Sequence, residues 1–191
     1  MSRKISFAVA LIGISVTTPA FAQDSDTETV AVAGQVAPLC ILGTPSQSSV
    51  NLGQLVDVSG TRVGRLTVIA NRTVSMPQSF CNYANSAIRV DATALTGSNT
   101  STPPAGFARA VNFGATVSGW ATTNAVATTA ATAAGTSPTA TATGGTQPAP
   151  KIGDVTLTLG TFSVPSDALL VAGNYSGQVV ITLGPAPGNG L

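Results

Sequence analysis

Histidine is absent from this 191-residue chain, and only two cysteines are present, Cys40 and Cys81. Without histidine, neither the Ser-His-Asp nor the Cys-His nucleophile system of hydrolases can be built. Two thiolates alone would leave a structural zinc site two ligands short. We therefore expect no bound metal, no cofactor and no hydrolase that uses a Ser-His-Asp or Cys-His system.

Charge is scarce as well, since charged residues make up only 8% of the chain. The basic residues are scattered rather than clustered, which argues against a nucleic-acid surface. A Ser-Lys pair would depend on Lys151, which sits beside prolines, and paired carboxylates would need acids that all fall at predicted strands or turns. We expect a protein that is not an enzyme. The acids after residue 28 are Asp57, Asp91, Asp154 and Asp167.

No apolar run reaches the roughly 20 residues that a membrane-spanning helix needs. The nearest candidate, Ile5 to Val16, follows Arg3 and Lys4 and precedes the small-x-small triplet Ala20-Phe21-Ala22. This order is typical of a cleavable export signal, here residues 1–22. We expect the mature chain, residues 23–191, to pass through the periplasm to the cell surface or beyond, without a transmembrane anchor.

Disulfides persist outside the cytoplasm, so the two cysteines of an exported chain most simply form one bridge. A Cys40–Cys81 bridge closes a loop of about 41 residues and would stabilise the fold by roughly 4 kcal/mol on the chain-entropy model.

Apolar residues alternate with polar or small ones along most of the mature chain, and apolar helical periodicity is absent. Period-2 alternation is typical of half-buried strands. We expect an all-β, immunoglobulin-like antiparallel sandwich with one disulfide, and a small barrel is the alternative. Strands are predicted at about 29–36, 49–58, 63–70, 87–95, 107–117, 154–164 and 175–183.

Two other features complete the domain. Met76-Pro77 and Asn82 predict a turn region around Cys81. The segment 121–150 is almost entirely Ala, Thr, Gly, Ser and Pro, and we expect an exposed low-complexity insertion with at most short strand pieces. Trp120 just before it is expected to anchor the core or its rim.

Three motifs occur in a suggestive order. Thr29 to Cys40 is an alternating stretch that runs through Gly34 into the first cysteine, and Val50-Asn51-Leu52-Gly53-Gln54-Leu55 precedes the second cysteine. The third is Ala172 to Leu183, which carries a Gly-x-Tyr-x-x-x-Val pattern. Together they resemble the pilin subunits of bacterial chaperone–usher pili, including their spore-coat-U-like branch.

That resemblance implies a sandwich that lacks its last strand, so that a core groove lies open beside the final strand. A periplasmic chaperone would fill the groove first, and the N-terminal extension of the next subunit would replace it at the usher. The chain would then be a structural subunit of a surface fibre or coat, with a role in adhesion or biofilm. The resemblance assigns the groove to Tyr175, Val179, Ile181 and Leu183, and the donor strand to Val30 and Val32.

Two alternatives stay open at this point. Val30 and Val32 could belong to the domain's own first strand instead of a donor strand. The chain could also be a monomeric secreted sandwich that binds a carbohydrate or protein partner, although one Trp and two Tyr supply few aromatic platforms.

Overall fold

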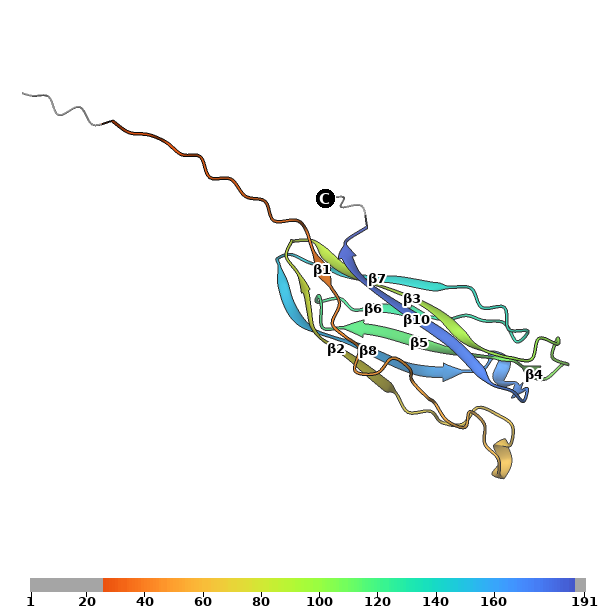
Figure 1. Ribbon diagram of the computed structural model, residues 1–191. Helices are drawn as coiled ribbons and strands as arrows, with labels where there is room; N and C mark the ends of the chain where they lie inside the picture. Colours follow the sequence, from red (N-terminus) through yellow and green to blue (C-terminus); the bar gives the residue numbers. More distant parts are fainter. Residues whose placement is uncertain (1–25, 188–191) are drawn as a thin grey trace, which may run out of the picture. The chain divides into compact units, whose positions relative to one another are not determined.

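The computed structural model describes residues 26–187, so the predicted export signal lies outside the described residues. The chain divides into an N-terminal unit that ends at Gln35 and a compact unit that begins at Val36. Residues 26–35, here called the arm, are exposed and form neither helix nor strand. Every element described below belongs to the compact unit (Figure 1).

The described residues contain ten strands and two short 3₁₀ turns, so the prediction of an all-β fold is confirmed. The strands are β1 (Cys40–Ile41), β2 (Arg72–Cys81), β3 (Ser86–Gly97), β4 (Phe107–Ala108), β5 (Ala110–Ser118), β6 (Ala125–Thr128), β7 (Ala140–Gln147), β8 (Lys151–Ser163), β9 (Leu169–Leu170) and β10 (Tyr175–Pro185). The turns are η1 (Gly60–Arg62) and η2 (Pro165–Asp167).

The strands form one curled antiparallel sheet in the order β1-β2-β8-β5-β3-β10. β6 pairs with β5, β7 pairs with β3, and β4 and β9 form a small parallel pair. Only two residue pairs, Leu95↔Val111 and Thr96↔Ala110, join β3 to β5. The fold is therefore a sandwich of two antiparallel layers linked along one side, a near-barrel that stays open between its end strands β1 and β10.

The core lies between these layers and follows the alternation of the strands. In β3, Ile88, Val90 and Ala92 are buried while Arg89 is exposed. Trp120 lies in the core, where its indole Nε1 donates a hydrogen bond to the Ser86 hydroxyl at 3.2 Å. The disulfide Cys40–Cys81 closes the core at the β1 end, which confirms the predicted bridge.

The predicted strands at 29–36, 49–58 and 63–70 are wrong. Residues 55–67 instead form a loose hairpin, here called the tip hairpin, with isolated bridges at Val56↔Leu66 and Asp57↔Val63. The β-branched composition that indicated strands has no sheet to cover, because Val68 is 98% exposed. Figure 1 places this hairpin at the end of the compact unit opposite β1.

The turn region predicted around Cys81 is confirmed at Asn82, where bends at residues 82–85 join β2 to β3, but it is wrong at Met76-Pro77, which lies within the ten-residue strand β2. The ladder to β8 shifts register between Met76 and Ser79. Proline is tolerated in a strand where a bulge removes the need for a backbone donor. Gln78 takes a positive φ of 54° in this bulge, which explains how a turn signal came to lie inside a strand.

The segment 121–150 is not an exposed insertion but contributes β6 and β7 to the fold. In β6, Ala125 and Ala127 face the core, and Ala131 is buried shortly after it. A Cβ placed on Gly144 would lie 2.9 Å from the main-chain oxygen of Thr123. These small residues therefore permit close packing. The sequence did not predict the two strands, because alanine, threonine and glycine differ too little in hydrophobicity to show an alternating pattern.

Replacing both Cys40 and Cys81 with Ser should lower the free energy of unfolding by about 4 kcal/mol. Without the bridge, the loop between two residues 41 positions apart is no longer closed in the unfolded chain, which therefore gains conformational entropy. Urea denaturation of the variant and of the oxidised wild type would measure the difference. A loss below about 1 kcal/mol would show that the bridge does not hold this end of the sheet.

Candidate functional site

β10 carries an unpaired edge. Its residues pair with β3 from Tyr175↔Gly97 to Pro185↔Ser86, and among the described residues no strand pairs with its other edge. Such an edge presents backbone N–H and C=O groups to any extended chain that approaches it. The lack of a partner on this side makes β10 the position at which a further strand would extend the sheet.

Beside this edge lies a groove of about 680 Å³, here called the core groove. One wall is β10, and the other is the irregular segment between Leu42 and Leu52. Its floor consists of buried residues of the main hydrophobic core, and partly buried apolar side chains lie in its two walls. The core residues that line it are Val74, Met76, Phe113 and Leu157.

Three of the four groove residues inferred from the sequence lie in this wall, namely Tyr175, Val179 and Ile181. All three are only partly buried, although they pack against the core. Leu183 is also partly buried against the core but is not among the residues that line the groove. Gly177 permits this strand to approach β3, because a Cβ there would lie 2.8 Å from the main-chain oxygen of Thr93.

Tyr175 stands at the boundary between the core groove and a second hollow of about 730 Å³. Its hydroxyl donates a hydrogen bond to the main-chain oxygen of Val171 at 2.7 Å. Burial raises the pKa of Tyr175, and the nearby charge of Arg109 opposes this shift. The side chain is thus a neutral, oriented wall of the groove and not a reactive phenolate.

The wall opposite β10 was not predicted from the sequence. It is tied to β2 near its start, where Gly43 N donates to Ser79 Oγ at 3.0 Å and Ser46 N donates to Ser75 O at 2.7 Å. From residue 48 to residue 54, the one hydrogen bond that the structure shows is local, from Gly53 N to Asn51 Oδ1. Val50 and Leu52 thus line the groove on a weakly held segment.

The candidate donor residues lie in the arm and are strongly exposed, Val30 by 84% and Val32 by 93%. The first strand of the domain begins at Cys40, so the structure does not place these valines in a first strand. They and the groove belong to different units of the chain.

Three consecutive residues hold the chain just after the arm, and we call them the grip: Cys81, Asn82 and Tyr83. Cys81 bonds to Cys40 through the disulfide, and the Tyr83 hydroxyl lies 3.0 Å from Cys40 Sγ. Between them, the Asn82 side chain accepts from Leu39 N and donates to Ala37 O, both at 2.8 Å. The Asn82 amide therefore acts like an extra peptide group that continues the β1–β2 ladder past Cys40.

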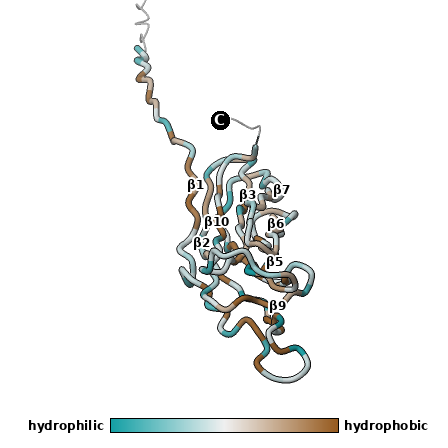
Figure 2. The backbone as a smooth tube through the Cα atoms, turned by 90° about the vertical axis from the view of Figure 1, so that its right-hand side faces the viewer, coloured by the Kyte–Doolittle hydropathy of each residue, from teal (hydrophilic) through white to brown (hydrophobic). Residues whose placement is uncertain are grey.

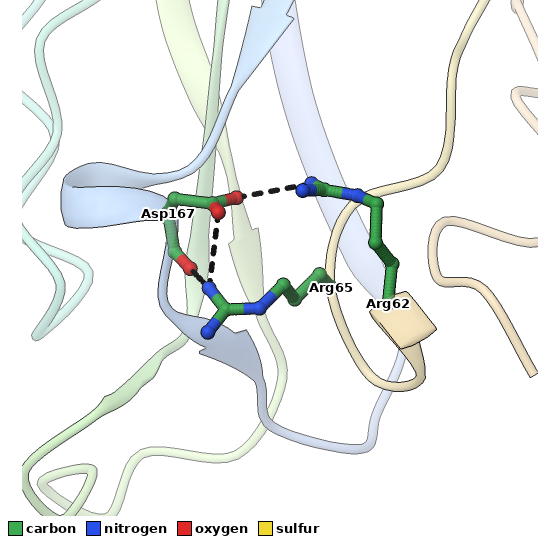
Figure 3. A network of polar contacts seen from close by, with 3 residues as sticks. All are labelled: Arg62, Arg65 and Asp167. Carbon is green, nitrogen blue, oxygen red and sulfur yellow. Dashed lines mark hydrogen bonds and ion pairs between the residues drawn. The ribbon is translucent and has the colours of Figure 1, made fainter. Parts of the chain in front are cut away.

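At the opposite end, Asp167 in η2 holds the tip hairpin through two arginines (Figure 3). Arg62 Nη2 lies 3.2 Å from Asp167 Oδ1, and Arg65 Nη1 lies 3.0 Å from Oδ2. Arg65 also donates to the main-chain oxygen of Asp167. These groups are exposed, so the ion pairs position the hairpin more than they stabilise the fold.

Comparison of the chain with models of protein families, with curated proteins and with solved structures found no match. Among residues 26–187, no helix is long and apolar enough to span a bilayer, and no three acidic, His or Cys side chains gather as metal ligands would. The unpaired edge and its groove are thus the features on which a functional argument can rest.

Replacing Asn82 with Ala should speed hydrogen exchange at the Leu39 amide by about tenfold and cost about 1–2 kcal/mol of stability, because one donor and one acceptor lose their partner. Exchange measured by NMR would test this. The matched variant Asn82→Asp keeps the acceptor for Leu39 N but not the donor to Ala37 O. Its exchange rate at the Leu39 amide and its stability should therefore lie between those of the wild type and of Asn82→Ala. Unchanged protection in Asn82→Ala would show that the grip depends on the disulfide alone.

Proposed function

We propose that this chain is an exported structural subunit of a surface fibre or coat. In this proposal, the arm of one copy adds as a strand to β10 of the next copy and fills its core groove. The observation that carries the proposal is the combination of an unpaired strand edge with a groove beside it whose walls hold partly buried apolar side chains. A sheet edge of this kind favours pairing with another extended segment.

The walls of the core groove explain why the occupant should be apolar. Val179 and Ile181 in β10 and Val50 and Leu52 in the opposite wall line the groove and are only partly buried. Burying such side chains stabilises a complex by about 25 cal/mol for each Å² of apolar area. A strand that brings apolar side chains to one face would therefore complete the core.

The arm, together with Val36 that directly follows it, has the pattern that such an occupant needs. Val30, Val32 and Val36 occupy even-numbered positions, so in an extended strand they point to the same face, with Gly34 between them. The seven residues from Val30 to Val36 span about 20 Å when extended. Residues Tyr175 to Ile181 of β10 that line the core groove also number seven, so the lengths of donor and acceptor agree.

An open groove of this kind also calls for protection before assembly. A periplasmic chaperone that lends a strand, and an usher that exchanges it for the arm of a neighbouring copy, would supply that protection. The paucity of charged residues and the absence of histidine are consistent with a structural role. No cofactor enters this proposal.

A synthetic peptide of residues 26–37 should bind to the purified chain whose own arm has been inactivated by Val32→Asp, measured by fluorescence anisotropy. The same peptide carrying Val32→Asp should bind at least about 100-fold more weakly, because a carboxylate would be buried without a partner. The matched control is Ala31→Asp, which places the same charge on the opposite face and should bind within about threefold of the unmodified peptide.

The acceptor can be tested in the same way. Ile181→Asp in β10 should abolish peptide binding, whereas Thr182→Asp on the outward face should preserve it. If the unmodified peptide does not bind, or if both aspartate variants of β10 behave alike, the proposal of strand addition is wrong.

A further inference from the structure

The outer face of the β2-β8-β5 layer carries two rows of hydroxyl side chains. Thr73 lies beside Thr158, which lies beside Thr116 on the next strand. One step along, Ser75, Thr156 and Ser118 form a parallel row. Small hydroxyl side chains hydrogen-bond with water readily, so this part of the surface needs no partner.

The same face ends in a different kind of row. Ile41 in β1 pairs with Phe80 in β2, which pairs with Ile152 in β8. Residues in register on neighbouring strands point to the same side of a sheet, about 5 Å apart. Ile41 is 52% exposed and Ile152 is 70% exposed, with Phe80 between them.

Leu39 adds to this row, since it lies two residues before Ile41 and is also exposed. We call Leu39, Ile41, Phe80 and Ile152 the end patch. In Figure 2 the chain at β1 is coloured hydrophobic. A contiguous group of large exposed apolar side chains marks an interaction surface, whereas single ones do not. The adjacent disulfide row of Cys40 and Cys81 faces inward, so the end patch is not part of the core.

The position of the end patch in the chain identifies its partner. Val36 is only three residues before Leu39, a span of at most about 11 Å. Asn82 fixes Ala37 and Leu39 within that span. Whatever groove receives the arm must therefore lie close to the end patch. On the proposed function, on which this step rests, that groove belongs to a second copy of this chain.

The orientation of strand addition selects the surface of that second copy. Antiparallel pairs are the more stable arrangement, and an arm antiparallel to β10 would place its Val36 end beside Tyr175. The hollow next to Tyr175 is lined by residues 49–56, the last two of which begin the tip hairpin. The tip hairpin and the residue after it carry exposed valines: Val58, Val63 and Val68.

The tip hairpin is held firmly enough to serve as a contact. Leu170 N donates to Gly64 O at 3.0 Å, and Asp167 pairs with Arg62 and Arg65. These bonds fix it to β9 and η2 (Figure 3). Its valines are thus presented on a supported loop.

We propose that the end patch of one copy packs against the tip hairpin of the copy that holds its arm. The two surfaces lie at opposite ends of the compact unit, so the contact is head-to-tail and repeats along a fibre. The arm supplies the first contact between neighbours, and the end patch supplies the second.

Ile152→Ser should weaken association of the full mature chain about tenfold, measured by sedimentation velocity, while binding of the 26–37 peptide stays unchanged. Val63→Ser should do the same from the other side. Because the two residues share one interface, the double variant should lose less than the product of the single losses. The matched control is Val126→Ser, which is 55% exposed on β6 and should associate as the wild type does.

These results separate this proposal from the previous one. If the peptide binds but Ile152→Ser associates normally, the end patch is not a contact. If Ile152→Ser weakens association but Val63→Ser does not, the partner surface is wrong. Failure of the peptide itself would overturn strand addition. Thermal unfolding and the parallel variant Ile41→Ser would show whether a loss of association reflects a loss of folding.

Discussion

An unpaired strand edge beside an apolar groove is the constraint on which the rest of this fold depends. Among the described residues β10 has a partner strand on one side only, and its Val179 and Ile181 side chains are partly exposed in the core groove. Backbone groups and apolar side chains both remain unsatisfied there, and each favours the same remedy, an extended apolar segment. The weakly bonded wall from residue 48 to residue 54 fits this requirement, because it can adjust to an incoming strand without breaking a ladder.

The chain around β1, at the other end of the sheet, is firmly held although β1 is only two residues long. Here the disulfide, the Asn82 amide and the Tyr83 hydroxyl bind Ala37, Leu39 and Cys40. A donor strand works best if its anchor is fixed, because the entropy of ordering the anchor has then been lost on folding and not on assembly. On the proposed function, a fixed anchor and a weakly bonded groove wall would have complementary roles in strand addition.

The sequence predicted the elements that alternate strongly and missed those whose side chains are small or unsupported. β3, β5, β8 and β10 follow from alternation of Ile, Val and Leu with polar residues. β6 and β7 use alanine and threonine, which contrast too little in hydrophobicity to be recognised. Around Val63 the opposite error occurs, because β-branched residues indicated a strand that has no partner. The end patch could not be predicted, since it depends on the register of β1, β2 and β8.

The small size of the end patch is itself informative. Four side chains cover far less area than the 1,200 Å² or so below which interfaces between proteins are weak and transient. Such a patch can still matter if another contact holds the two copies together, because the effective concentration across a short connection is high. The two-residue connection between Val36 and Leu39 meets that condition. On the proposed function, the end patch can stay exposed in a free subunit, because it is too small to drive association alone and would contribute only after an arm has been inserted.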